Sequence, residues 1–201
     1  MQNETGCYVF FVHTGQEDIA STYLNDLLSY YDDVEYQLLV PKRKLVEYHS
    51  GVLKVVYKNM FPGYIFIYTG NIVRIHAILR LNWHSSVLRL LKADDCFQKV
   101  EKRELLPILN LINRDGVVES STVFVENEKV YVFDGPLLNY TGIITCINPR
   151  RNRVRVMLDF LDRKTEVDIC ADYLMRMGVE NFKNMVLLKK AVVKNNPPAV
   201  I

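Results

Sequence analysis

The sequence has no long hydrophobic run. No apolar stretch approaches the ~18–20 residues that a membrane-spanning helix needs. The first residues, Met-Gln-Asn-Glu-Thr-Gly, contain neither a basic nor an apolar segment of the kind found in secretory signals. We therefore expect a cytoplasmic protein with no membrane partner.

Residue patterns that bind metals or carry out catalysis are also missing. The four cysteines form no Cys-x-x-Cys pair and are far apart: Cys7, Cys96, Cys146 and Cys170. The four histidines have no partner at the spacing of a metal site or a catalytic triad: His13, His49, His76 and His84. No glycine-rich phosphate loop or nucleophile elbow is present, and the adjacent acids Asp94 and Asp95 fit a solvated loop. The sequence therefore predicts neither an enzyme nor a metal or cofactor site.

What is present is the composition of a folded protein. The 201 residues are 49% hydrophobic and 24% charged, which suits one or two domains, each with its own core. The net charge is only +2, and residues 115–178 carry 8 Lys or Arg against 10 Asp or Glu. Any binding of nucleic acid must therefore come from a local, oriented patch and not from the overall charge.

The first part of the chain alternates between strand and helix patterns. Apolar, β-branched and aromatic residues predict strands over 8–13, 34–40, 64–68 and 87–91, with a hairpin over 42–47 and 52–58. Apolar residues at helical spacing predict helices over 19–28, 71–81 and 100–113. The predicted fold class is α+β, with a mostly antiparallel sheet and helices packed on it.

The strand over 64–68 has two different faces. Tyr64, Phe66 and Tyr68 share one face, while Ile65 and Ile67 share the other. One face must meet the predicted helices. The other face is either further core or an apolar patch that a partner helix could cover, and the pattern leaves both interpretations open.

The pattern of the sequence changes from mixed helix and strand segments to short β segments after a polar segment. We interpret 1–114 as the first domain, 115–122 as a linker with few contacts, 123–178 as a second domain and 179–201 as a C-terminal tail. Short β runs separated by sharp turns in the second domain predict a small β-barrel.

The second domain contains the densest basic cluster of the chain. Four arginines lie within six residues, at a turn that enters a strand: Arg150, Arg151, Arg153 and Arg155. Arginine suits phosphate binding and stacking on bases, so the cluster predicts RNA binding, with Arg163 and Lys164 as neighbours across the barrel. An equally good interpretation is a solvated turn whose arginines pair with Asp159 or Asp162.

Several motifs occur in the order and spacing of one known family. They are Cys-Tyr-Val at 7–9, Val-Pro at 40–41, Phe-Pro-Gly-Tyr at 61–64, a glycine-containing segment at 130–142 and Thr-Glu-Val-Asp-Ile at 165–169. Together they resemble the NusG family of transcription elongation factors over roughly residues 7–177. The resemblance implies an N-terminal NGN domain followed by a C-terminal KOW domain, an SH3-like barrel.

The resemblance also implies partners and contact residues. In relatives the NGN domain binds the clamp helices of RNA polymerase, which corresponds here to Phe61, Tyr64 and Phe66. The turn after the first strand faces nontemplate DNA in relatives, and here that turn carries His13, Thr14 and Gln16. The expected form is a monomer without a cofactor.

Departures from the family pattern point to a specialised member. Leu137 replaces the usual aromatic residue, and Leu161-Asp162 follows Phe160 where general NusG proteins have glycine. The arginine-rich turn and the segment 12–17, which begins at the end of the first predicted strand, resemble the LoaP subfamily more than general NusG proteins. That likeness implies an operon-specific antiterminator that recognises a leader RNA hairpin through its KOW domain.

Two other interpretations stay open at this point. One is a general NusG-type elongation factor whose KOW domain contacts protein partners, such as a small-subunit ribosomal protein or Rho. The other is an SH3-barrel RNA-binding module without a role at polymerase.

Overall fold

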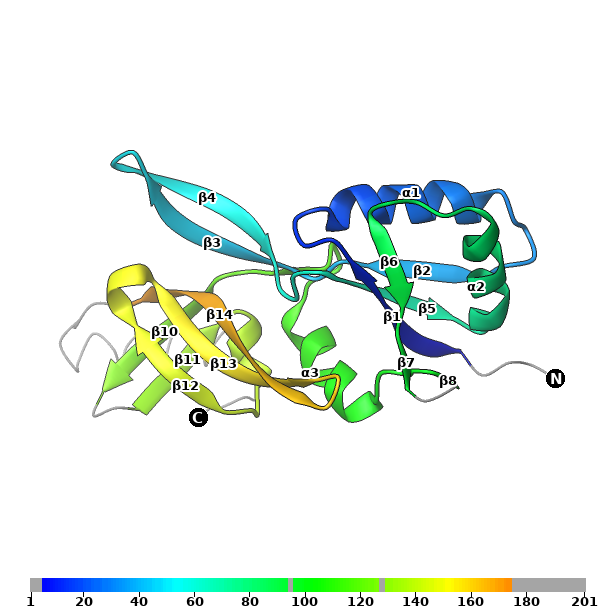
Figure 1. Cartoon of the computed structure of the whole chain (residues 1–201). Helices are drawn as coiled ribbons and strands as arrows, with labels where there is room; N and C mark the ends of the chain where they lie inside the picture. Colours follow the sequence, from blue (N-terminus) through cyan, green and yellow to red (C-terminus); the bar gives the residue numbers. More distant parts are fainter. Residues whose placement is uncertain (1–4, 94–95, 127–128, 175–201) are drawn as a thin grey trace.

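The computed structural model consists of two units in contact, an N-terminal α+β unit and a C-terminal β-barrel (Figure 1). The structure describes residues 5–93, 96–126 and 129–174. The last residues of the predicted barrel domain, 175–178, and the predicted tail, 179–201, lie outside the described residues.

The N-terminal unit is built on a four-stranded antiparallel sheet with the strand order β2-β5-β1-β6. Its strands are β1 (Gly6–Val12), β2 (Tyr36–Leu39), β5 (Tyr64–Thr69) and β6 (Val87–Leu90). All four coincide with predicted strands, so the prediction of an antiparallel sheet is confirmed.

Helices α1 (Glu17–Ser29) and α2 (Ile72–Leu81) cover one face of this sheet. Their apolar positions at helical spacing are buried and pack with Ile65 and Ile67 of β5. The alternation predicted for β5 is therefore real: its isoleucines face these helices, and its aromatic residues point to the opposite face.

Helix α3 (Lys102–Leu111) packs with the opposite face, and its buried Ile108 and Leu111 belong to the same core cluster as Phe66. A capping box between Glu101 and Glu104 defines its N-terminus. Pro107 lies in the second turn and leaves one backbone carbonyl without its helical donor.

The predicted hairpin is formed by β3 (Lys42–His49) and β4 (Val52–Asn59), and it projects from the N-terminal unit. A second, small hairpin pairs β7 (Lys92–Ala93) with β8 (Cys96–Phe97). None of the helices among the described residues is long and apolar enough to cross a membrane.

The predicted linker 115–122 is not a loose connection. It contains β9 (Val117–Val118), which runs parallel to β3, and Val118 and Ser121 are fully buried. The backbone N–H of Lys42 donates to the carbonyl of Gly116. The expectation of few contacts was therefore wrong, because this segment supplies a strand, the core residue Val118 and the buried Ser121.

The C-terminal unit is a five-stranded sheet with the order β11-β10-β14-β13-β12, closed around an apolar core. Its elements are β10 (Ser121–Glu126), β11 (Lys129–Asp134), the 3-10 turn η1 (Pro136–Asn139), β12 (Ile144–Asn148), the 3-10 turn η2 (Pro149–Arg151), β13 (Arg153–Phe160) and β14 (Arg163–Tyr173). Leu137, which replaces the usual aromatic residue, is fully buried in this core. The prediction of a small barrel is confirmed.

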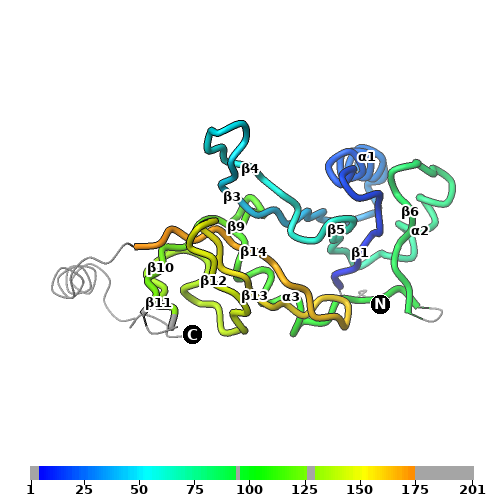
Figure 2. Tube along the Cα trace, turned by 60° about the vertical axis from the view of Figure 1, so that its left-hand side comes forward, coloured from blue at the N-terminus to red at the C-terminus, as the bar shows by residue number. Residues whose placement is uncertain are grey.

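The two units share one hydrophobic core. The long β13–β14 hairpin extends from the barrel and lies against the N-terminal unit, with its turn beside β1, β5 and α3 (Figures 1 and 2). Phe61, Phe66 and Phe160 belong to the same buried cluster as the barrel core. This shared core positions the candidate functional site.

Candidate functional site

The aromatic face of β5 starts from a tight turn at residues 61–64. Gly63 has φ +86°, a conformation that favours glycine, and its backbone N–H donates to Oε1 of Glu17 at 2.6 Å. Glu17 is only 1% exposed, at the start of α1. Sequence reasoning missed this residue, because an acid in the first turn of a helix ordinarily faces solvent.

The barrel covers this aromatic face. The ring of Phe160 lies 4.3 Å from the ring of Phe61, and 5.3 Å from each of the rings of Tyr64 and Phe66, measured between centroids. Phe61, Phe66 and Phe160 are all buried, and Tyr64 is half-buried. Of the two interpretations that the sequence left open, this face is therefore further core, and the chain's own second domain contributes to that core.

The turn that carries Phe160 is held by helix α3. Leu161 and Asp162 both have positive φ angles, 53° and 58°, as the two central residues of a tight hairpin turn require. The carboxylate of Glu104 accepts a hydrogen bond of 2.8 Å from the backbone N–H of Asp162. The residues that stand in place of the family's glycine therefore form part of the contact between the units.

The arginine cluster lies at the other end of the same hairpin. Arg150 and Arg151 are exposed in η2, where the backbone N–H of Arg151 donates to the side chain of Asn148. Arg153 and Arg155 follow on one face of β13.

Arg163 and Lys164 are not neighbours of this cluster. Arg163 pairs with Phe160 and Lys164 with Asp159, whereas Arg153 pairs with Cys170. At about 3.3 Å per residue, roughly 23 Å of strand separates Arg153 from Phe160, the residue opposite Arg163, and roughly 13 Å separates Arg155 from Asp159, the residue opposite Lys164. Their predicted grouping was wrong because they belong to the two opposite ends of one hairpin.

Arg163 instead lines a cleft between the two units. The cleft has a volume of about 560 Å³, and both units contribute to its walls. Arg89 and Lys92 of the N-terminal unit also line it, so three cations surround the aromatic contact.

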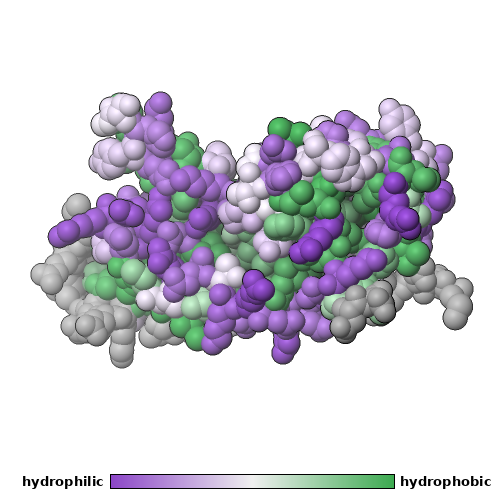
Figure 3. Space-filling model, viewed as in Figure 1, coloured by the Kyte–Doolittle hydropathy of each residue, from purple (hydrophilic) through white to green (hydrophobic). Residues whose placement is uncertain are grey.

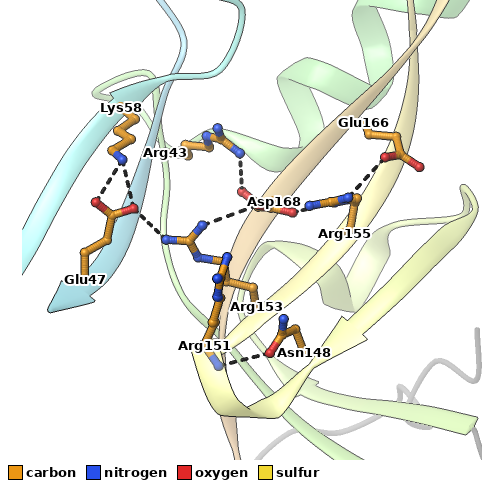
Figure 4. Close-up of polar contacts among 9 residues, drawn as sticks. All are labelled: Arg43, Glu47, Lys58, Asn148, Arg151, Arg153, Arg155, Glu166 and Asp168. Carbon is orange, nitrogen blue, oxygen red and sulfur yellow. Dashed lines mark hydrogen bonds and ion pairs between the residues drawn. The ribbon is translucent and has the colours of Figure 1, made fainter.

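The arginines of β13 are ion-paired, but not to the acids suggested by sequence (Figure 4). Arg155 contacts Asp168 at 2.7 Å and Glu166 at 3.3 Å. Arg153 contacts Asp168 at 3.4 Å and, across the contact between the units, Glu47 of β3 at 2.6 Å. The prediction that Asp159 or Asp162 would be the partner was wrong, because neighbouring strands bring Asp168 and Glu166 closer.

These contacts change the pKa values of two carboxyl groups. Hydrogen bonds from Lys58 and Arg153 hold the pKa of Glu47 below its ordinary value. Burial alone would raise the pKa of Asp168, but the hydrogen bond from Arg155 and the nearby guanidinium groups lower it overall. Both groups are therefore ionised at neutral pH.

The turn after β1 adjoins a loop that sequence reasoning did not single out. His13, Thr14 and Gln16 are exposed, and the backbone N–H of His13 donates to the carbonyl of Ser86. In the same loop Trp83 is 73% exposed. An isolated tryptophan in a polar segment was the available signal, because such a large apolar side chain is rarely left in solvent without a role.

The buried thiol of Cys7 is not a reactive group. Burial raises the pKa of the Cys7 thiol to about 12. In the part of the chain that the structure describes, no three His, Cys, Asp or Glu side chains come together as metal ligands would.

Comparison with known proteins identifies the family. The family described as "Transcription termination factor nusG" matches residues 7–109, half of the chain. The chain belongs to the NusG family. Similar NusG relatives include the transcription termination/antitermination proteins of Thermus thermophilus, 29% identical over 176 residues, and of Escherichia coli K12, 25% identical over 171 residues.

The NusG likeness extends over both units. The Thermus thermophilus alignment covers 80% of this chain and 93% of the relative, and the Escherichia coli alignment covers 81% and 91%. A solved structure, "Domain interaction in Thermotoga maritima NusG", is similar with a TM-score of 0.54 and 19% identity, over 83% of this chain and 94% of that chain. The predicted fold, an NGN unit followed by a KOW barrel, is confirmed.

Proposed function

We propose that this NusG-family protein is an operon-specific antitermination factor of the LoaP type. Its NGN unit binds the clamp helices of RNA polymerase through Phe61, Tyr64 and Phe66. Its KOW barrel recognises a structured leader RNA through the arginine cluster, and the bound protein promotes readthrough of terminators.

The packing of Phe160 on three aromatic side chains is the observation that carries this proposal. These side chains form an apolar surface that a different part of the chain covers. Aromatic residues in a desolvated pocket are the usual anchors of protein interfaces. A polymerase helix can occupy the same surface only after the barrel hairpin has left it.

The RNA interface is centred on η2. Arg150 and Arg151 are exposed at the tip, and neither has an ion pair among the described residues. Guanidinium groups at an exposed tip can contact phosphates and stack on unpaired bases. Arg153 and Arg155 extend this surface along β13, whereas Arg163 lines the cleft between the units and Lys164 lies beside it at the far end of the hairpin.

A second nucleic-acid contact is proposed on the NGN unit. His13, Thr14 and Gln16 are exposed beside the loop that carries Trp83. An exposed indole next to polar side chains can stack on a base of nontemplate DNA. Arg80 and Arg89, which line the cavity of about 460 Å³ beside Trp83, would attract the DNA backbone.

The polymerase contact is tested by two substitutions with opposite expected effects. Tyr64→Ala removes an anchor and should weaken binding of the full chain to RNA polymerase by ~1–3 kcal/mol. Phe160→Ala removes the competing ring and should strengthen binding severalfold. Leu81→Ala, at a side chain that is 85% exposed, is the matched control. Equal loss of binding in both test variants would contradict the proposal.

The RNA contact is tested by the variant Arg150→Ala/Arg151→Ala. It should lose binding to RNA stem-loops and lose readthrough in cells, while its binding to polymerase stays unchanged. Because about four phosphate contacts are expected, the slope of log affinity against log salt should be about −3 to −4 for the parent protein. Unchanged RNA binding by the double variant would remove the assignment.

A second candidate function is general transcription elongation. The similar curated proteins are named transcription termination/antitermination protein NusG, and this favours it. Transcriptome mapping with and without the protein separates the two: changes confined to a few operons fit the first proposal, and changes across most transcripts fit the second.

A further inference from the structure

The β3–β4 hairpin has an unpaired edge. β4 lies at the edge of the three-stranded sheet β4-β3-β9 and has no strand on its other side in the part of the chain that the structure describes. β3 and β4 pair without a bulge from Lys42 with Asn59 to His49 with Val52. The hairpin projects from the N-terminal unit with β3 toward the barrel and β4 on the far side (Figures 1 and 2). Eight residues of regular strand are therefore open to a further strand.

The turn of the hairpin decides which backbone groups face this edge. Ser50 and Gly51 form a two-residue turn, with φ angles of 53° and 79°. Such a turn is closed by a hydrogen-bonded pair, here His49 with Val52, and every second pair along the strands is then hydrogen-bonded. The residues between these pairs point their N–H and C=O groups away from β3, toward the free edge: Leu53, Val55 and Tyr57.

The same three residues form an apolar face. Leu45 is buried and Glu47 contacts the barrel, so the side chains of the alternate residues lie on the face that is turned away from the barrel. The exposed fractions on this outer face are 54% for Leu53, 53% for Val55 and 57% for Tyr57. Tyr48, which pairs with Leu53, continues this face on β3 and is also exposed. Contiguous apolar side chains in solvent mark an interaction site.

The other face of β4 carries a cation without a counter-ion. Lys54 is exposed and forms no ion pair within residues 5–93, 96–126 and 129–174, because its cross-strand neighbour Glu47 is held by Lys58 and Arg153. The other lysines of the hairpin each have an acid at 2.8 Å: Lys42 has Asp18, Lys44 has Glu119 and Lys58 has Glu47. A strand with an acidic side chain opposite Lys54 therefore finds a matching charge.

This pattern fits a protein strand better than nucleic acid. A polyanion needs several free cations in a row, and the hairpin offers Lys54 alone among its lysines. Leu53 and Val55 also have no ring on which a base could stack. Their outward N–H and C=O groups instead match the backbone of an extended peptide.

A second copy of this chain fits the edge poorly. Antiparallel pairing of two β4 strands would place both barrels on the same side of the joined sheet, since each barrel contacts β3 at Arg43 and Glu47. The two β3 strands would lie roughly 14 Å apart, which is three strand spacings of about 4.8 Å. A barrel with two layers of strands and their side chains needs about 20 Å, so the barrels would clash. An extended segment brings no such bulk.

We propose that β4 accepts an extended segment of another protein as a fourth strand of the sheet. The segment carries apolar side chains on the face of Leu53, Val55 and Tyr57, and an acidic side chain opposite Lys54. Its backbone hydrogen bonds supply affinity, and the alternation of acidic and apolar residues supplies specificity. This contact is separate from the proposed surfaces for polymerase, RNA and nontemplate DNA, and it does not depend on them.

The probe is the blocked peptide acetyl-Ser-Glu-Val-Thr-Val-Glu-Ser-amide. It reads the same in both directions, so parallel and antiparallel pairing both place a glutamate opposite Lys54 and valines on the outer face. Amide chemical shifts of the isotope-labelled full chain are followed as the peptide is added. We expect changes in β3 and β4 only, with the largest at Leu53, Val55 and Tyr57, whose N–H groups gain an acceptor.

Two further peptides separate the contributions of backbone and charge. The peptide with N-methyl groups on its five central residues cannot donate to β4 and should not bind. The peptide with lysine in place of both glutamates should bind about five- to tenfold more weakly, because like charges then lie opposite each other at Lys54.

Lys54→Gln removes the charge of the side chain and keeps most of its length. It should weaken binding of the acidic peptide by about two- to fivefold, and it should narrow the difference between the acidic and the lysine peptides. Lys102→Gln, at an exposed lysine of α3, is the matched control and should leave both affinities unchanged.

Each outcome decides the proposal. Shifts at the three β4 amides, with the expected order of the peptides and the expected effect of Lys54→Gln, support it. No shift of these amides at millimolar peptide overturns it, and equal binding of the acidic and lysine peptides overturns the acidic partner. Shifts that grow with protein concentration in the absence of peptide would assign the edge to a second copy. Tighter binding of an oligothymidine than of the acidic peptide would assign it to nucleic acid.

Discussion

At the scale of single residues, buried carboxylates organise the surface that would meet polymerase. Glu17 accepts the backbone N–H of Gly63, and Glu104 accepts the backbone N–H of Asp162. Each acid lies in the first turn of a helix and reaches a turn far away in the sequence. The two turns carry the aromatic residues that meet between the units. These acids therefore act as positioning residues for both sides of the contact.

We predict that Glu17→Ala lowers the free energy of unfolding by about 1–3 kcal/mol, because it leaves a buried N–H group without an acceptor. Binding to RNA polymerase should weaken too, since the turn that presents Phe61 and Tyr64 loses its support. Thermal or urea unfolding and a polymerase binding assay measure the two effects. Asp18→Ala, at a neighbouring exposed ion pair with Lys42, is the control and should change stability by less than about 1 kcal/mol.

At the scale of elements, the segment between the units behaves as a strand. β9 pairs with β3, and Ser121 accepts a hydrogen bond from the backbone N–H of Leu137 in the barrel. Lys44 and Glu119 form a further ion pair of 2.8 Å. The segment belongs to the fold of both units, so separation of the units must start elsewhere, along the β13–β14 hairpin.

We predict that limited proteolysis of the parent protein cuts the tip of the β3–β4 hairpin before it cuts 115–122. Ser50 and Gly51 form the exposed tip and both have positive φ angles, whereas Val118 and Ser121 are buried. Mass spectrometry of the first fragments identifies the site. An initial cut within 115–122 would show that β9 opens readily.

At the scale of the whole molecule, a polar contact at one end and an apolar contact at the other hold the units together. Figure 3 shows hydrophilic residues over the region where the hairpin and the barrel meet, and hydrophobic residues farther along the same face, toward β1 and β6. Ligands can therefore act on each end separately. Under the proposed function, a nucleic-acid phosphate would act at the polar end and a polymerase helix at the aromatic end.

We predict that acid weakens the contact between the units. The pKa values of Glu47 and Asp168 are lower in the folded chain than their ordinary values of 4.5 and 3.8. Their stabilising contribution is therefore complete above those values and is lost as the pH falls below them. The distance between labels on the two units, followed from pH 7 downward, should increase in this range. In the Glu47→Gln variant, the increase in the distance between the labels that begins near pH 4.5 should be absent.

The sequence by itself determined the two folds and the family. Period-two alternation in β5, helical spacing in α1 and α2, and turn residues in the barrel are local patterns, and local sterics and burial decide them. The five ordered motifs identified the NusG family, and the family comparison confirmed it. The RNA-binding and nontemplate-DNA residues stay predictions.

Only the tertiary structure decided what covers the aromatic face and where the arginines pair. Sequence spacing placed Arg163 beside Arg153, but a hairpin of this length puts them at opposite ends. The partners Glu47 and Phe61 come from the other unit, 106 and 99 positions away from Arg153 and Phe160. Contacts over such separations depend on how the two units dock, and docking leaves no periodic signal in either segment.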